Sequence, residues 1–226
     1  MAYIIAIDEG TTSTRAVLYD LDKKRITAQK ASPVKQIYPE QGYVEENAGE
    51  IYAETLASLV EMIEQADKPE SILGIGVTNQ RETVIAWDKI TGKPLYNAIV
   101  WQCRRTAETI AEIGEKHGGT IREKTGLVLD AYFSASKMKW LMDNVPAIRE
   151  KSRRGRAVLR NGRQFSLLQT HGRESICNRR YQRVPNDAFQ YSHLRMGRRA
   201  SEYFRNSEKL SAESYHVGRD GWGIRV

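Results

Sequence analysis

Two polar stretches hold the residues with the clearest chemical potential, and each follows an apolar run. The first is Asp8–Arg15 (DEGTTSTR), in which a carboxylate and a glycine precede four hydroxyl side chains. The apolar runs Ile4–Ile7 and Ala16–Tyr19 flank it, which predicts a β-hairpin. Its turn can aim backbone N–H groups and hydroxyls at a phosphate while Asp8 faces a metal ion. An ordinary surface turn is the alternative, because Gly, Thr and Ser are common turn residues.

The second polar stretch is Asn79–Glu82 (NQRE), between the predicted strands 71–78 and 83–87. Loops at strand ends carry functional residues more often than their share of the chain. Arg81 can donate several hydrogen bonds and Glu82 can accept several, which suits a polyol or a sugar. The alternative is an Arg–Glu ion pair whose members satisfy only each other.

The elements around these stretches predict an α/β fold, because strands and helices alternate along the chain. Apolar residues at helical spacing predict a helix over 50–65, with Asn47 as its N-cap. The remaining predicted elements are a third strand at 25–31, a helix at 104–116 that stops at Gly118–Gly119, a short helix at 121–124 and a helix at 134–143.

Charge divides the chain near Lys151. Residues 1–150 hold 18 Lys and Arg against 22 Asp and Glu, whereas residues 151–226 hold 17 against 6. Two cysteines, Cys103 and Cys177, form neither a disulfide framework nor a metal cluster. No apolar run approaches the ~20 residues that span a bilayer, and no signal peptide is evident. We therefore expect a cytoplasmic protein.

Three motifs, in order and at matching spacing, resemble a known family. Asp8–Arg15, Asn79–Thr83 and Asn97–Thr106 (NAIVWQCRRT) are similar to the amino-terminal part of the glycerol kinases, which are FGGY carbohydrate kinases. The resemblance runs continuously from about residue 3 to about residue 155. It implies an actin-like, ribonuclease-H-like ATPase fold and transfer of the ATP γ-phosphoryl group to glycerol, with Mg²⁺. It also implies homo-oligomers for full-length members. No Walker-type motif is present, so a P-loop kinase is not indicated.

The resemblance also implies roles for single residues. The ATP and phosphate residues would be Asp8, Gly10, Thr11, Thr12, Ser13 and Arg15, with Asp8 also facing Mg²⁺. The glycerol residues would be Arg81, Glu82, Trp101 and Tyr132. The family's catalytic base, an Asp, lies in the second half of its chain, so no catalytic residue is assigned here. Departures from the family are Glu9 for Gln, Ala131 for Pro and Ala135 for Gly, and Glu9 adds a negative charge beside the predicted phosphate turn.

The arginine-rich residues 156–226 show no sustained helical or strand period. Read one base later from within the codon of Arg156, with free codon choice, they can continue the family pattern (ELFYGTVDS, then TNASRTMLFNIH) over more than 50 positions. We therefore expect an incomplete kinase domain at 1–155 and a disordered, out-of-frame tail at 156–226, which makes this chain an inactive fragment. The alternatives are another FGGY sugar kinase and a nucleic-acid binder with a basic tail.

Overall fold

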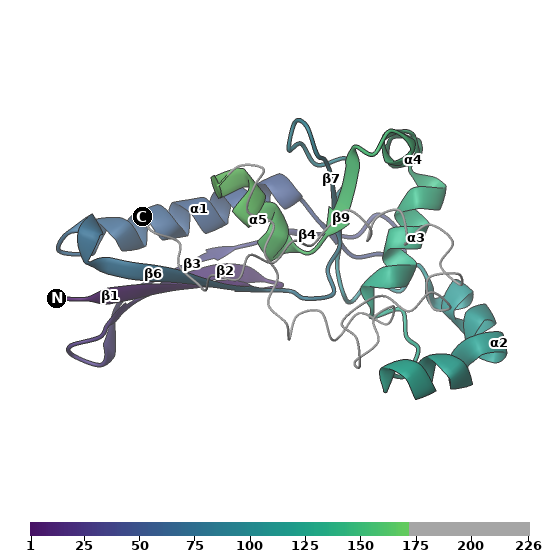
Figure 1. Cartoon of the computed structure of the whole chain (residues 1–226), viewed down its shortest axis with the longest axis horizontal. Helices are drawn as coiled ribbons and strands as arrows, with labels where there is room; N and C mark the ends of the chain where they lie inside the picture. The colour runs from purple at the N-terminus through teal and green to yellow at the C-terminus, as the bar shows by residue number, and fades with distance from the viewer. Residues whose placement is uncertain (172–226) are drawn as a thin grey trace, which may run out of the picture.

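The computed structural model describes residues 1–171 (Figure 1). The rest of the predicted tail, residues 172–226, lies outside the described residues, and so does Cys177. The strands are β1 (Tyr3–Glu9), β2 (Ser13–Asp20), β3 (Arg25–Pro33), β4 (Gln36–Ile37), β5 (Glu45–Glu46), β6 (Ile72–Asn79), β7 (Ile85–Asp88), β8 (Ala98–Ile99) and β9 (Ala157–Arg160). The helices are α1 (Ala48–Glu64), the 3₁₀ turn η1 (Pro69–Ser71), α2 (Ala107–Thr125), α3 (Ser134–Asn144), α4 (Pro146–Arg153) and α5 (Gly162–His171).

The main sheet has the strand order β3–β2–β1–β6. β1 and β2 form the antiparallel hairpin that the sequence predicts. β6 lies on the other side of β1 and runs parallel to it, with Asp8 beside Thr78 and Glu9 beside Asn79. Since parallel strands end at the same edge of a sheet, this topology brings the two polar stretches together.

α1 covers the core face of this sheet (Figure 1). The predicted helix is confirmed, and so is its cap. The side chain of Asn47 accepts hydrogen bonds from the backbone N–H groups of Gly49 and Glu50 at 2.9 and 3.2 Å. These bonds satisfy two N–H groups that the first helical turn leaves without partners. Ile51 and Met62 are buried against the sheet.

A second core forms around the antiparallel pair β7–β9, beside which α3 and α4 pack. The buried carboxylate of Asp88 joins its parts. It accepts hydrogen bonds from Lys151 Nζ at 2.5 Å and from an Arg156 guanidinium nitrogen at 2.9 Å. The Lys151 hydrogen bond, followed by backbone N–H groups, holds the pKa of Asp88 well below its usual range. Asp88 thus ties β7 to the end of α4 and to the start of β9.

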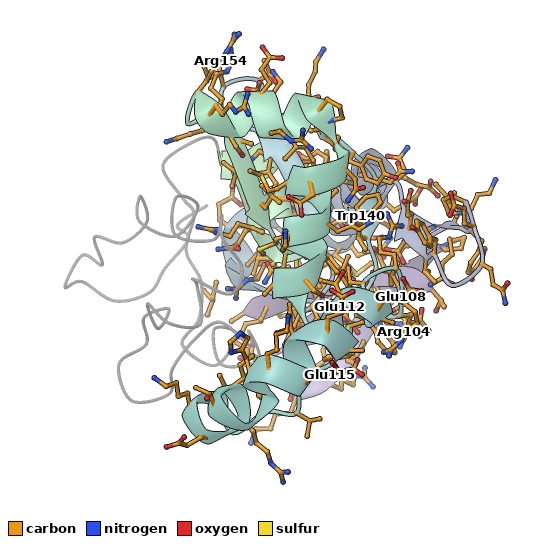
Figure 2. The ribbon with its side chains drawn as sticks, turned by 90° about the vertical axis from the view of Figure 1, so that its right-hand side faces the viewer. Arg104, Glu108, Glu112, Glu115, Trp140 and Arg154 are labelled. Carbon is orange, nitrogen blue, oxygen red and sulfur yellow. The ribbon has the colours of Figure 1, made fainter. Side chains whose placement is uncertain are left out.

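A buried arginine connects β5 to α3. Arg105 donates a hydrogen bond to Glu45 at 2.6 Å, and its guanidinium lies 4.1 Å from the ring centroid of Tyr43 and 4.4 Å from that of Trp140. Figure 2 labels Trp140 on the side of the molecule that also carries α2. Stacking between two rings adds cation–π attraction to the ion pair.

The prediction of two helices, at 104–116 and 121–124, is wrong. α2 is one continuous helix that runs through Gly118 and Gly119. Each interior glycine costs about 1 kcal/mol relative to alanine, but the buried Ile110 and Ile121 hold the two halves on one face. The helix ends at Gly126, whose φ of 74° is the left-handed cap conformation. The exposed carboxylates Glu108, Glu112 and Glu115 line its outer side (Figure 2).

The folded part continues beyond residue 155, which corrects the expectation of disorder for residues 156–171. β9 pairs with β7, and Phe165 of α5 is buried against Trp87 at a ring-centroid distance of 5.5 Å. Strand pairing uses backbone groups, so the pattern Ala157–Arg160 forms a strand without a long alternating signal. Among residues 1–171, no helix has the length and apolar character that crossing a membrane requires.

Candidate phosphate and polyol site

The turn between β1 and β2 is tight and is held by its own backbone. The N–H of Gly10 donates to the carbonyl of Ser13 at 3.1 Å, and the N–H of Val34 donates to the carbonyl of Thr12 at 3.0 Å. A Cβ atom at Gly10 would lie 2.8 Å from the Ser13 carbonyl oxygen. Only glycine therefore fits this turn without a backbone shift.

The residues predicted to handle phosphate lie together at this end of the sheet. Asp8 and Arg15 are exposed and directly opposite each other on neighbouring strands. Thr12 is exposed, and Thr11 and Ser13 are half-buried. Hydroxyls, turn amides and one guanidinium thus share one open surface, which is the donor set that a phosphate requires.

A metal site is less developed in this region. Among residues 1–171, no group of three or more His, Cys, Asp or Glu side chains is arranged to hold a metal ion. Asp8 is a single exposed carboxylate at the end of β1. This donor suits Mg²⁺, which keeps most of its waters and takes one or two carboxylates together with substrate phosphates.

The Arg81–Glu82 pair lies at the end of β6. The Glu82 side chain is buried and accepts a hydrogen bond through Oε2 from the Tyr132 hydroxyl at 3.0 Å. Its Oε1 atom has no hydrogen-bond partner and lies 4.0 Å from Nε of Arg81, whose side chain is 46% exposed. Arg81 and Glu82 therefore form a long ion pair that leaves Oε1 without a hydrogen bond, and a buried acceptor of this kind calls for a partner.

Two aromatic rings form a wall beside Glu82. Trp101 and Tyr132 meet edge to face with ring centroids 5.6 Å apart. Burial and the nearby Glu82 carboxylate raise the pKa of Tyr132, so its hydroxyl stays protonated and remains a donor. The Trp101 indole Nε1 donates to Thr11 Oγ1 at 2.9 Å. The predicted glycerol residues are thus brought together, and one of them contacts the predicted phosphate turn.

Comparison with known proteins identifies the family. The sequence model of the FGGY family of carbohydrate kinases, N-terminal domain, matches residues 3–160. The chain belongs to the FGGY carbohydrate kinase family. The sequence-based prediction of the family is therefore confirmed.

The relatives of this FGGY domain include glycerol kinases. Glycerol kinase of Brachyspira hyodysenteriae is 56% identical over 156 residues, which cover 68% of this chain and 31% of that protein. Glycerol kinase 2 of Thermotoga maritima is 50% identical over 160 residues, or 70% and 32% of the two chains. The crystal structure of Plasmodium falciparum glycerol kinase with ADP is 31% identical with a TM-score of 0.84, covering 94% of this chain and 42% of that one.

The chain therefore spans about a third of the length of the two curated relatives. The mixed α/β architecture and these matches confirm the predicted actin-like, ribonuclease-H-like fold.

Sequence reasoning missed the residues that support Tyr132 in this FGGY domain. The buried Lys137 of α3 donates through Nζ to the carbonyls of Tyr132 and Phe133, the latter at 3.1 Å. Asp130 accepts from the N–H of Tyr132 at 2.6 Å and from Arg104 at 2.8 Å. A signal was present, because Lys137 is four residues before the buried Leu141 and so lies on the inner side of α3.

Glu9 differs from its sequence-based interpretation. Its side chain points into the core and is 1% exposed, because alternation along β1 puts Asp8 and Glu9 on opposite faces. It accepts hydrogen bonds from Thr55 at 3.4 Å and from Ser166 of α5. Burial raises the pKa of Glu9 to about 7, against the opposing effect of these hydrogen bonds. Its carboxylate therefore does not lie among the residues predicted to bind phosphate.

Glu46 of β5 is a second buried acid behind the turn. Its Oε2 atom accepts from Gln80 Nε2 at 2.9 Å, and Oε1 has no hydrogen-bond partner. Burial raises the pKa of Glu46 to about 7, although the hydrogen bond from Gln80 lowers it. The sequence predicts Gln80 in a polar loop, whereas the structure places it between β5 and the turn.

Proposed function

We propose that this FGGY domain serves the ATP-dependent phosphorylation of glycerol to sn-glycerol 3-phosphate. The observation that carries the proposal is the state of the buried Glu82 carboxylate. One of its oxygens is held by the Tyr132 hydroxyl and the other lacks a hydrogen-bond partner. This acceptor lies beside an aromatic wall that reaches the Gly10 turn through Trp101 and Thr11. The identities of 50–56% with glycerol kinases support glycerol as the polyol.

The polyol would bind between the Arg81–Glu82 pair and the wall. Glu82 Oε1 accepts one hydroxyl of glycerol, and the exposed guanidinium of Arg81 donates to another. Trp101 and Tyr132 pack against the carbon chain. A site of this kind discriminates strongly against analogues that lack a hydroxyl, because the buried acceptor would then stay unpaired.

The turn would bind the phosphates. Phosphoryl transfer depends mainly on positioning and on neutralising negative charge. Backbone N–H groups and the hydroxyls of Thr11, Thr12 and Ser13 supply donors, and Arg15 supplies a positive charge. Asp8 would hold Mg²⁺, which neutralises phosphate charge when bound. The ADP in the Plasmodium falciparum glycerol kinase structure supports ATP as the phosphoryl donor.

We further propose that residues 156–226 are translated out of frame. The change from −4 to +11 in net charge between residues 1–150 and 151–226 supports this, as does the end of the family match at residue 160. β9 and α5 do not conflict with it, because a short segment that supplies a few apolar side chains, such as Leu159 and Phe165, can pair and pack whatever its origin. Sequencing the gene decides the matter: nucleotides that do not encode TNASRTMLFNIH in the shifted frame rule the idea out.

The functional test compares two proteins, the 226-residue chain and the product of the frame-restored gene. We expect glycerol-dependent ADP release from the frame-restored protein and glycerol binding without turnover from the 226-residue chain. Glu82→Gln should weaken glycerol binding by about 10- to 100-fold, since hydrogen bonds to charged groups contribute about 1.5–3 kcal/mol. Glu112→Gln, an exposed change on α2, is the matched control. Preference for xylulose or gluconate over glycerol would instead indicate another FGGY sugar kinase.

A further inference from the structure

Thr83 is a buried hydrogen-bond junction beside the site. Its side chain is 2% exposed, and its Oγ1 atom is both donor and acceptor. It donates to Gln80 Oε1 at 2.8 Å and accepts from the backbone N–H of Trp101 at 3.1 Å. A hydroxyl is the smallest group that can do both, so valine in its place would keep the shape and lose both bonds.

The two partners of Thr83 lead to the same turn. Gln80 donates through Nε2 to the carbonyl of Gly10 at 3.0 Å. Trp101 donates through Nε1 to the hydroxyl oxygen of Thr11 at 2.9 Å. Because Gly10 and Thr11 are consecutive, these contacts close a circuit: Gly10, Gln80, Thr83, Trp101 and Thr11. Each member is joined to the next by a hydrogen bond or, for Gly10 and Thr11, by a peptide bond. A displacement of one member therefore acts directly on its neighbours in the circuit.

The circuit orients groups that face the two ligands. The Thr11 oxygen accepts the indole N–H, so the hydroxyl proton of Thr11 remains available to donate to a phosphate. Both backbone polar groups of Gly10 are held, since its carbonyl accepts from Gln80 and its N–H donates to Ser13. On the polyol side, the two Trp101 bonds set the orientation of the ring that meets Tyr132.

We propose that this circuit couples polyol binding to phosphate binding, with Gln80 and Thr83 as positioning residues. A polyol packed against Trp101 restrains the indole, and the restraint reaches Thr11 and the turn amides. A phosphate on the turn restrains the indole in return. Coupling of binding free energies is reciprocal, so each ligand must tighten the other by the same factor. The identity of the two ligands rests on the proposed function, whereas the circuit itself does not.

Three variants of the 226-residue chain test the coupling. Thr83→Val breaks the circuit, and Thr83→Ser keeps the hydroxyl and should restore it. Thr125→Val is the matched control, because Thr125 is also 2% exposed, donates to the Ile121 carbonyl at 2.7 Å and accepts from the Leu127 N–H at 3.1 Å, within the end of α2. A merely structural effect of losing a buried hydroxyl would appear in both valine variants.

The first measurement needs no ligand. The amides of Gly10 and Val34, both hydrogen-bonded in the turn, report its local opening through hydrogen exchange. We expect Thr83→Val to speed exchange at these two amides by about tenfold, which corresponds to the loss of about one hydrogen bond. The amide of Ile7, in the middle of β1, should not change. Unchanged exchange at Gly10 and Val34 in Thr83→Val would overturn the circuit.

The second measurement is the dissociation constant of a non-hydrolysable Mg·ATP analogue with and without saturating glycerol. Glycerol should tighten analogue binding by about five- to tenfold in the wild-type, Thr83→Ser and Thr125→Val proteins, at the low end of typical coupling. The factor should fall to about one in Thr83→Val. An unchanged factor in Thr83→Val overturns the proposal. If the wild-type chain binds no glycerol, the proposed function fails for this chain, and the ligand-free exchange measurement then decides the circuit by itself.

Discussion

The turn at Gly10 and the wall at Trp101 form one candidate site but take their shapes from different sources. The turn closes on itself through a bond between near neighbours, Gly10 to Ser13, although Gln80 also donates to the Gly10 carbonyl. The wall is assembled across the chain: the bond between Tyr132 and Glu82 spans 50 positions, and that between Trp101 and Thr11 spans 90. A local structure depends on a few residue types, whereas an assembled one depends on every element that carries a member. Substitutions should therefore affect the two sides differently.

The largest effect is expected behind the wall, at Lys137. Lys137→Met keeps the chain length but leaves the carbonyls of Tyr132 and Phe133 without these donors. We expect the free energy of unfolding to fall by about 3 kcal/mol, since each unsatisfied buried group costs about 1–3 kcal/mol. Glycerol binding should weaken as well, because Tyr132 loses its support.

Urea denaturation measures the Lys137 effect, and Lys139→Met is its control. Lys139 lies on the same helix and pairs with Asp143 at the surface, so its loss should change stability by less than about 0.5 kcal/mol. Equal effects of the two substitutions would contradict the assignment of Lys137 as a support of the wall.

A pH-dependent effect is expected behind the turn, at Glu9. Its pKa is raised to about 7 by burial, so the folded state holds a proton that the unfolded state releases near its ordinary value of 4.5. This contribution to stability is present at low pH and is lost as the pH rises through about 7. Between pH 5 and pH 8, Glu9 should therefore lower the free energy of unfolding by about 2 kcal/mol.

Glu9→Gln removes this titration and keeps the shape of the side chain. The variant should be more stable than the wild type by about 2 kcal/mol at pH 8 and close to it at pH 5. Denaturant titrations at the two pH values measure the difference. Identical pH slopes for the two proteins would show that Glu9 does not titrate as its burial requires. In the variant, the free energy of unfolding should still fall as the pH rises, but less steeply, because the pKa of Glu46 is raised in the same way.

Gly10→Ala should affect the turn much more than the wall. The added methyl group would lie 2.8 Å from the Ser13 carbonyl oxygen, so the turn must open. We expect a loss of about 1–2 kcal/mol in stability from backbone strain. Binding of the Mg·ATP analogue should weaken, while glycerol binding should change much less. Calorimetric titration of each ligand checks this, and equal weakening of both would erase the distinction between turn and wall.

The smallest effect is expected at Asn47, the N-cap of α1, which belongs neither to the turn nor to the wall. Asn47→Ala removes the side-chain acceptor for Gly49 and Glu50 at the start of α1. Loss of an N-cap of this kind costs about 1 kcal/mol. Thermal unfolding should register this loss, and the affinities for both ligands should stay unchanged. A change in either affinity would mean that α1 contributes to the site beyond its support of the sheet.

These contrasts explain how much could be predicted from residue order. The hairpin, the capped helix α1 and the strand β6 follow from short-range patterns: alternation, helical spacing and a capping residue. The length of α2 could not be predicted in this way, because Gly118 and Gly119 are poor helix formers that only tertiary burial of Ile110 and Ile121 overrides. β9 and α5 were missed for a similar reason, since their weak patterns become ordered only against β7 and α1.

Residue types and spacing were enough to identify membership of the FGGY family and to predict a phosphate-type turn at Asp8–Arg15 and a donor–acceptor pair at Arg81–Glu82. The packed fold decided which polar atoms already have hydrogen-bond partners and which do not. Oε1 of Glu82 lacks a hydrogen-bond partner, while the carboxylate of Glu9 is turned into the core. The reason is physical. The identity of a side chain sets what bonds it can make, but burial and distant neighbours set which of those bonds are already made.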